Sequence, residues 1–304
     1  MSNTLLSLVI LLIASNVLAS DKNIDGCFSH FKGQDFSKSI EFGKKAIKSS
    51  PKKFDSHFCL GISYKEISEY KSALAELKHA EKLATKQDEV AGVSSFIGGI
   101  YITLRNYDEG LKYSNKALAI RRDLEDSTGI SQELNNIATI YTQTGQTEKA
   151  LEYYQQSLDV EPNKSKKANT YGNIGVLYLV SRRAAEAEPY FIKALDIAEN
   201  NGDYQGQATF LTRLGQAEYK QGKLDIAKEH LIKGRDMSRS VKAPEFEGMA
   251  IHFLGNVYFK LGDIETSIEH LNQAIAIFNK IGNSDSVKYV QQDIDFIKKQ
   301  AAAK

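Results

Sequence analysis

The chain has 304 residues, of which 42% are apolar and 25% are charged, and this composition is typical of a folded globular protein. Lys and Arg number 39 against 38 Asp and Glu, leaving a net charge of +1. This balance excludes the strong positive field with which proteins attract nucleic acid or acidic membranes. Because only four prolines and no tryptophan are present, we expect long helices rather than many short strands and turns.

The first twenty residues differ from the rest of the chain. Leu5 to Ala14 is almost unbroken aliphatic, and Val17-Leu18-Ala19 precedes the first charged side chain, Asp21. The apolar run is shorter than the about 20 residues that cross a bilayer. We therefore predict a signal peptide over residues 1–19, with export across the inner membrane and a mature chain that begins at Ser20 or Asp21. The alternative is an uncleaved anchor, since no Lys or Arg precedes Leu5, and only this form would associate the protein with a membrane.

Segments of one plan recur from Leu60 onward. LGISYKEISEYKSALAELKHAEKLA begins at Leu60, and LGNVYFKLGDIETSIEHLNQAIAIF begins at Leu254. Each has a small residue, an aromatic residue three positions later, a turn, and then an Ala or Ser nine positions after the aromatic residue. A period of this length predicts a solenoid of stacked supersecondary units. The leading small residues recur in steps of 37, 40, 37, 40 and 40, at Gly61, Gly98, Ala138, Gly175, Gly215 and Gly255.

Both halves of each repeat are predicted to be helical. Around Ala138, the first half places Ile137 and Ile140 on one face of a 3.6-residue helix, and the second half does the same with Ala150 and Tyr154. Gly145 breaks the pattern between the two halves. One repeat departs from the plan, because Glu218 occupies its aromatic position.

This pattern resembles the tetratricopeptide repeat family. The residues that carry the resemblance are Gly61, Tyr64, Tyr70, Ala73 and Ala80 in one repeat, and Gly255, Tyr258, Gly262, Ser267, Leu271 and Ala274 in another. It implies an all-α fold, a right-handed superhelical solenoid of antiparallel helix pairs. The steps exceed the family's usual length of about 34 residues, and we attribute the excess to longer second helices.

The resemblance also implies the organisation of the chain. We expect residues 20–304 to form the solenoid, closed by a capping helix over residues 284–299. Seven repeats are expected before that helix, at about residues 25–51, 55–84, 91–124, 131–162, 168–199, 208–238 and 248–278.

The two cysteines fall in the predicted first helices of the first two repeats, at Cys27 and Cys59. A pair of cysteines in an exported chain favours a disulfide, and closing this loop would contribute about 3–4 kcal/mol. The predicted register turns Cys27 toward the core and Cys59 toward the groove, which favours two free packing residues instead. The sequence leaves both alternatives open.

No pattern typical of catalysis or of a bound cofactor is found in the sequence. Gly222-Lys223 continues into Leu224-Asp225, so no P-loop follows, and the six histidines form neither HExxH nor an i, i+4 pair. We therefore expect no catalytic residues, no enzyme activity, no cofactor, no metal site and no small-molecule substrate.

In relatives of this kind, the first helices of successive repeats line a concave groove that holds an extended peptide or a partner helix. The groove positions flank the small residue, and here they include Asn135, Asn136, Thr139, Asn173, Val176, Arg213, Gln216, Tyr219, His252, Asn256 and Phe259. A carboxamide has both a donor and an acceptor, so we expect Asn136 and Asn173 to hold a peptide backbone. Arg213, Lys220 and Lys260 suit an acidic or carboxylate feature of the partner.

We therefore expect an exported, periplasmic scaffold or adaptor that binds a protein or peptide through its concave groove. The alternative function is a sensory or regulatory module that binds a signalling peptide and acts on a separate output protein. No nucleic-acid partner is expected in either case.

Overall fold

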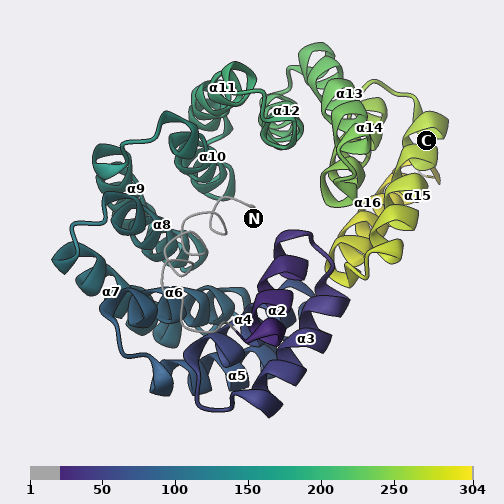
Figure 1. The fold of residues 1–304 in the computed structure, drawn as a ribbon. Helices are drawn as coiled ribbons and strands as arrows, with labels where there is room; N and C mark the ends of the chain where they lie inside the picture. Colours follow the sequence, from purple (N-terminus) through teal and green to yellow (C-terminus); the bar gives the residue numbers. More distant parts are fainter. Residues whose placement is uncertain (1–20, 303–304) are drawn as a thin grey trace. The chain divides into compact units, whose positions relative to one another are not determined.

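The computed structural model describes residues 21–302, and in this range the chain is all-helical, as predicted (Figure 1). The predicted signal peptide lies outside the described residues. The fifteen helices are α2 (Lys22–Lys32), α3 (Phe36–Ser49), α4 (Phe54–Glu66), α5 (Tyr70–Leu83), α6 (Gln87–Thr103), α7 (Tyr107–Asp123), α8 (Ser127–Gln143), α9 (Thr147–Val160), α10 (Lys164–Val180), α11 (Ala184–Asn200), α12 (Tyr204–Lys220), α13 (Leu224–Ser240), α14 (Pro244–Lys260), α15 (Ile264–Lys280) and α16 (Ser284–Ala302).

The helices form two compact units, one ending at Thr144 and one beginning at Gly145. Even-numbered helices are the first helices of the repeats, and odd-numbered helices are the second helices. Within each unit every helix packs against the helix that follows it, which is the helix-pair arrangement that the repeat pattern predicts. The expectation of an all-α solenoid is therefore confirmed.

The turns between helices explain why each helix ends where it does. A residue in the left-handed conformation follows the last helical turn, for example Gly222 with φ +79° and Gly262 with φ +89°, and glycine adopts this conformation without steric cost. The next residue often caps the following helix: the Asp263 side chain accepts a hydrogen bond from the Thr266 N–H. Arg182 takes the left-handed conformation at φ +60°, so the turn geometry is kept where the sequence lacks glycine.

In four repeats the leading glycine of the first helix lies directly against a large side chain of the second helix. A Cβ atom on Gly175 would lie 2.6 Å from Cε1 of Phe191, and one on Gly215 would lie 2.6 Å from Cγ of Leu231. Real Cβ atoms do not come this close, so only glycine allows the two helices to pack at this spacing. Gly61 lies similarly close to Leu77, and Gly255 to Leu271. In all four pairs the two residues are sixteen positions apart in the sequence.

A disulfide joins Cys27 on α2 to Cys59 on α4, with 6.3 Å between the two Cα atoms. The predicted register of Cys59 toward the groove is wrong, because both cysteines are fully buried. The physical reason is that α2 and α4 pack side by side, so that one face of each helix points into the same interior. The Ser39 hydroxyl lies in this interior, 3.6 Å from the Cys27 sulfur and 2.7 Å from the Ser63 hydroxyl.

The disulfide closes a loop of 32 residues, so replacing both cysteines with Ala should lower the free energy of unfolding of the first unit by about 3–4 kcal/mol. Denaturant unfolding of the oxidised and reduced chain measures this difference. The double variant is the control, since reductant should not change its unfolding curve. Identical curves for the oxidised and reduced wild type would show that the bond contributes nothing.

Candidate peptide-binding face

The first helices form the inner, concave layer of each unit. In the first unit α2 packs on α4, α4 on α6 and α6 on α8, and in the second α10 packs on α12, α12 on α14 and α14 on α16. No two successive second helices within a unit have comparable contacts. In a curved stack the inner layer is the one whose members lie closer together, so the first helices line the concave side.

All eleven predicted groove residues lie on first helices. Those of the first unit are Asn135, Asn136 and Thr139 on α8, and we call them the α8 face. Those of the second unit are Asn173 and Val176 on α10, Arg213, Gln216 and Tyr219 on α12, and His252, Asn256 and Phe259 on α14, and we call them the α10–α14 face. His252 is buried and the other ten are partly buried.

Arg213 gives the α10–α14 face its positive charge. Within residues 21–302 its guanidinium makes one hydrogen bond, to Oε1 of Gln216 at 3.1 Å, and it has no carboxylate at ion-pair distance. Burial lowers the pKa of the Arg213 guanidinium, and the charge of Glu245 partly opposes this shift. A guanidinium has five N–H donors, so most of the donors of this partly enclosed cation are available to an acceptor from outside the chain.

The C-terminal end of the α10–α14 face contacts α16. The Asp293 Oδ2 atom lies 2.6 Å from His252 Nε2 and accepts a hydrogen bond from Asn256 Nδ2 at 2.9 Å, while the Phe296 ring packs edge-on against Phe259 at 6.1 Å. Burial raises the pKa of Asp293, but the hydrogen bonds from His252 and Asn256 outweigh it and hold the pKa below its ordinary value. Three predicted groove residues therefore hold α16 in place.

Asp293 was not among the residues predicted from the sequence, although the sequence contains a signal for it. Asp293 comes 41 residues after His252, close to the repeat step of 40. Two residues separated by about one repeat lie on adjacent first helices, so a histidine and an aspartate at this separation are expected to meet.

A glutamate under the α8 face was not predicted from the sequence either. Glu133 is fully buried: its Oε1 atom contacts the Ser95 hydroxyl of α6, and its Oε2 atom accepts a hydrogen bond from Asn136 Nδ2 at 3.1 Å. Burial raises the pKa of Glu133 to about 7, against the hydrogen bonds from Ser95 and Asn136 and the charge of Arg121. The available signal was helical spacing, since Glu133 precedes Ile137 and Ile140 by four and seven positions and so shares their buried face.

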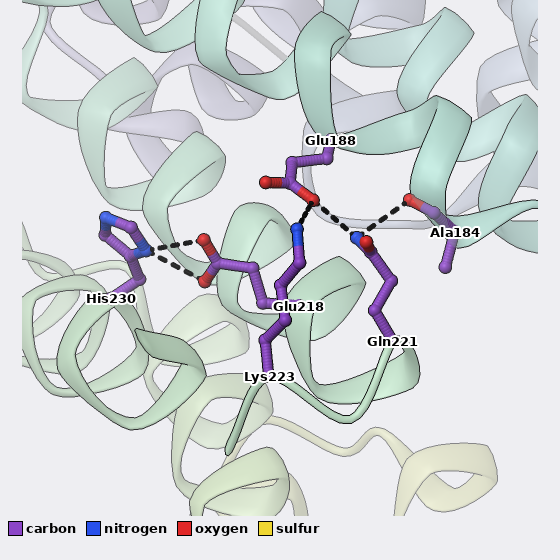
Figure 2. A network of polar contacts seen from close by, with 6 residues as sticks. All are labelled: Ala184, Glu188, Glu218, Gln221, Lys223 and His230. Carbon is purple, nitrogen blue, oxygen red and sulfur yellow. Dashed lines mark hydrogen bonds and ion pairs between the residues drawn. The ribbon is translucent and has the colours of Figure 1, made fainter. Parts of the chain in front are cut away.

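Glu218, the residue that replaces an aromatic ring, has a histidine partner. In other repeats the aromatic residue meets the side chain twelve positions later, as Tyr178 does with Tyr190 at 5.5 Å between ring centroids. Glu218 keeps this geometry, because its two carboxylate oxygens lie 3.0 and 2.8 Å from Nδ1 of His230, as Figure 2 shows. The hydrogen-bonded Glu218–His230 pair therefore occupies the place of an aromatic pair, which explains how the repeat tolerates a buried carboxyl group.

The same network connects neighbouring repeats (Figure 2). Glu188 on α11 accepts hydrogen bonds from Gln221 Nε2 at 2.6 Å and from Lys223 Nζ at 2.7 Å, and Gln221 also donates to the Ala184 carbonyl at 3.3 Å. Gln221 and Lys223 belong to the turn between α12 and α13. These polar residues thus tie α11 to the next repeat.

Residues 21–302 contain no group of three or more His, Cys, Asp or Glu side chains that could hold a metal ion. In the same part of the chain, no helix combines the length and the apolar character needed to cross a bilayer.

Comparison with protein families decides the classification. Models of the tetratricopeptide repeat match residues 89–161 and 166–240, and a further model of this repeat matches residues 250–280. The chain belongs to the tetratricopeptide repeat family. The family resemblance predicted from Gly61, Tyr64 and their counterparts is therefore confirmed.

Curated relatives resemble parts of this repeat protein. The outer dynein arm-docking complex subunit 4 of Danio rerio is 27% identical over 140 residues, which are 46% of this chain and 29% of the relative. The photosystem I assembly protein Ycf3 of Synechococcus sp. (strain CC9311) is 36% identical over 98 residues, which are 32% of this chain and 49% of the relative. The chain thus spans less than half of either relative.

Solved structures share the fold over nearly the whole repeat array. The apo form of the quorum sensor NprR from B. thuringiensis matches with a TM-score of 0.76 and 20% identity, covering 92% of this chain and 82% of that one. A Rap protein complexed with competence and sporulation factor matches with a TM-score of 0.66 and 18% identity, covering 92% and 86%. At these identities the likeness concerns the fold alone.

We expect the contacts of Asp293 with His252 and Asn256 to stabilise α16 against local opening. Asp293→Asn should lower the free energy of opening of α16 by about 1–3 kcal/mol, because the buried His252 and the partly buried Asn256 lose a charged acceptor. Since the pKa of Asp293 is lowered, its contribution is present above the unfolded value of 3.8 and is lost as the pH falls through the folded value.

Amide hydrogen exchange in α16 measures this opening free energy. Asp295→Asn is the matched control, since Asp295 is an exposed carboxylate on the same helix. Equal exchange rates in the two variants would contradict a holding role for Asp293.

Proposed function

We propose that the protein is an exported, non-catalytic scaffold that binds a polypeptide segment along its first helices. The observation that supports this most is Arg213, a charged side chain on the concave layer of the second unit with most of its donors unused by residues 21–302. A partner that supplies a carboxylate there would form charge-assisted hydrogen bonds with the guanidinium. Membership of the repeat family supports the same mode of binding.

In this proposal the carboxamides of the two faces bind the partner's backbone. Asn136 in the first unit and Asn173 in the second lie on first helices and are partly exposed. A carboxamide can accept from a peptide N–H and donate to a peptide C=O, which allows binding that depends little on the partner's side chains. His252, Asn256 and Phe259 contribute less, because they already contact α16.

The proposed location is the periplasm. The apolar run of residues 5–14 supports it, and so does the Cys27–Cys59 disulfide, because such bonds persist in oxidising compartments. In this proposal the protein is not an enzyme, and membrane association would require that residues 1–19 are kept.

The second candidate is a regulatory module that binds a signalling peptide and acts on a separate output protein. The likeness to the fold of the quorum sensor NprR, with a TM-score of 0.76, and to a Rap protein complexed with competence and sporulation factor, favours it. Crosslinking capture from the protein's own cells separates the two candidates: a regulatory module yields a short peptide together with an output protein, whereas a scaffold yields structural or assembly proteins.

The affinity for the captured partner tests the role of Arg213. Arg213→Ala should weaken binding by roughly 10- to 150-fold, since hydrogen bonds to a charged group contribute about 1.5–3 kcal/mol, and the loss should shrink as salt rises. Lys233→Ala is the matched control, because Lys233 is an exposed cation on the second helix α13. Equal losses in both variants would place the binding surface outside the α10–α14 face.

N-terminal sequencing of the protein from the envelope fraction tests export. The expected first residue is Ser20 or Asp21, because a signal peptidase would cut after the small residues of Val17-Leu18-Ala19. A sequence that starts at Met1 or Ser2 would contradict cleavage.

A further inference from the structure

The Ser95 hydroxyl on α6 has two oxygen neighbours but only one proton to donate to them. The Ser95 Oγ atom lies 3.0 Å from the Ala91 carbonyl and also contacts Glu133 Oε1. A serine hydroxyl has one proton to donate, and both of these neighbours are acceptors if Glu133 is ionised. With an ionised Glu133 the single hydroxyl proton is shared between the two acceptors, whereas a proton on Glu133 Oε1 can be donated to Ser95 while Ser95 donates to the Ala91 carbonyl, so that each contact has its own proton.

The second oxygen of Glu133 is compatible with this protonated form. Oε2 accepts from Asn136 Nδ2 at 3.1 Å, and the carbonyl oxygen of a carboxylic acid remains an acceptor. With one proton on Oε1, the chain from Asn136 through Glu133 and Ser95 to Ala91 has a donor and an acceptor at every step. Glu133 is fully buried, so an ionised carboxylate would lack the water that normally solvates it.

The charged groups of the packed helices do not neutralise an ionised Glu133. The helix α6 faces it with the neutral Ser95, and α7 faces it with Arg121. Arg121 is already paired, since its Nη1 atom lies 2.9 Å from Oδ2 of Asp126. Its charge therefore acts on Glu133 at a distance, without a hydrogen bond between the two side chains among the described contacts.

We propose that Glu133 is a proton-binding site that joins α6 to α8 and sets the orientation of the Asn136 carboxamide on the α8 face. An ionised Glu133 only accepts, so it fixes the amino end of Asn136 against itself and leaves the amide oxygen of Asn136 for other partners. A protonated Glu133 holds Asn136 through a weaker, neutral hydrogen bond. The step is the loss or gain of one proton at Oε1, accompanied by rotation of the Ser95 hydroxyl.

The consequence for binding rests on the proposed function. If Asn136 contacts the partner's backbone, loss of the proton would favour partners whose N–H groups meet the amide oxygen. Burial raises the pKa of Glu133 to about 7, so this change of state falls near neutral pH, where a group with the ordinary value of 4.5 would not titrate.

Infrared difference spectroscopy of the full, partner-free chain tests the proton site directly. The C=O stretching band of a buried, protonated carboxyl should disappear as the pH rises, with a midpoint of about 7, and should be absent in Glu133→Gln. Glu229→Gln, which changes an exposed glutamate, should leave the band intact. A band that persists in Glu133→Gln, or a midpoint near 4.5 in the wild type, would overturn the proposal.

The side-chain NH₂ signals of Asn136 in NMR test the coupling. They should shift with the midpoint of the infrared band in the wild type and stay constant in Glu133→Gln. Asn136→Ala should move the infrared midpoint upward, because the hydrogen bond from Asn136 favours the ionised carboxyl. Asn136 signals that do not respond to pH, or an infrared midpoint that does not move in Asn136→Ala, would overturn the positioning role.

The pH dependence of unfolding gives a second test, because a purely structural role of Glu133 would not make unfolding depend on its protonation. The pKa of Glu133 is raised on folding, from 4.5 to about 7. Its contribution to the free energy of unfolding is therefore fully present below pH 4.5 and is lost as the pH rises from 4.5 to about 7. The unfolding equilibrium constant of the wild type should therefore rise up to about tenfold per pH unit relative to Glu133→Gln across this window. A parallel pH dependence in both would contradict the proposal. All these measurements use the partner-free protein, so they stand even if Arg213 proves unrelated to binding.

Discussion

The close approach of first and second helices at one small residue is the constraint on which the rest of the structure depends. At Gly215 a single added carbon would lie 2.6 Å from Leu231, so the spacing of the pair is fixed by the absence of a side chain. The face of each first helix that is not covered by its second helix is the face that can contact the neighbouring first helices. The first helices then contact one another within each unit, and their exposed positions form one concave layer in each unit.

Some polar side chains of the first helices form hydrogen bonds with the neighbouring first helix and so are not available to a partner. Ser95 and Glu133 join α6 to α8 in the first unit, and His252 and Asp293 join α14 to α16 in the second. These pairs lie 38 and 41 residues apart, about one repeat, so they occupy similar places in the stack. Arg213 has no such partner on its neighbouring first helices, and this difference is why we assign it to an external partner.

The helix pairs and their small residues could be predicted from the sequence because helical spacing and repeat steps are local properties. The orientation of Cys59 could not, since it depends on how α2 packs beside α4. Glu133 was overlooked because a charged residue suggests solvent, although its spacing from Ile137 places it on the buried face. Part of the Glu218–His230 pair could be predicted: the missing aromatic ring was evident from the sequence, but its replacement by a hydrogen bond between Glu218 and His230 depends on the contact between α12 and α13.

The proposed binding of a polypeptide partner on the first helices can be tested by photo-crosslinking in the protein's own cells. The photoreactive amino acid is placed at Gln216 on the first helix α12 or at Lys233 on the second helix α13. Both positions lie in the second unit, and Lys233 is exposed, so the two positions report on different helix layers. We expect a specific adduct from position 216 and none from position 233. An adduct from position 233 alone would contradict the proposed binding.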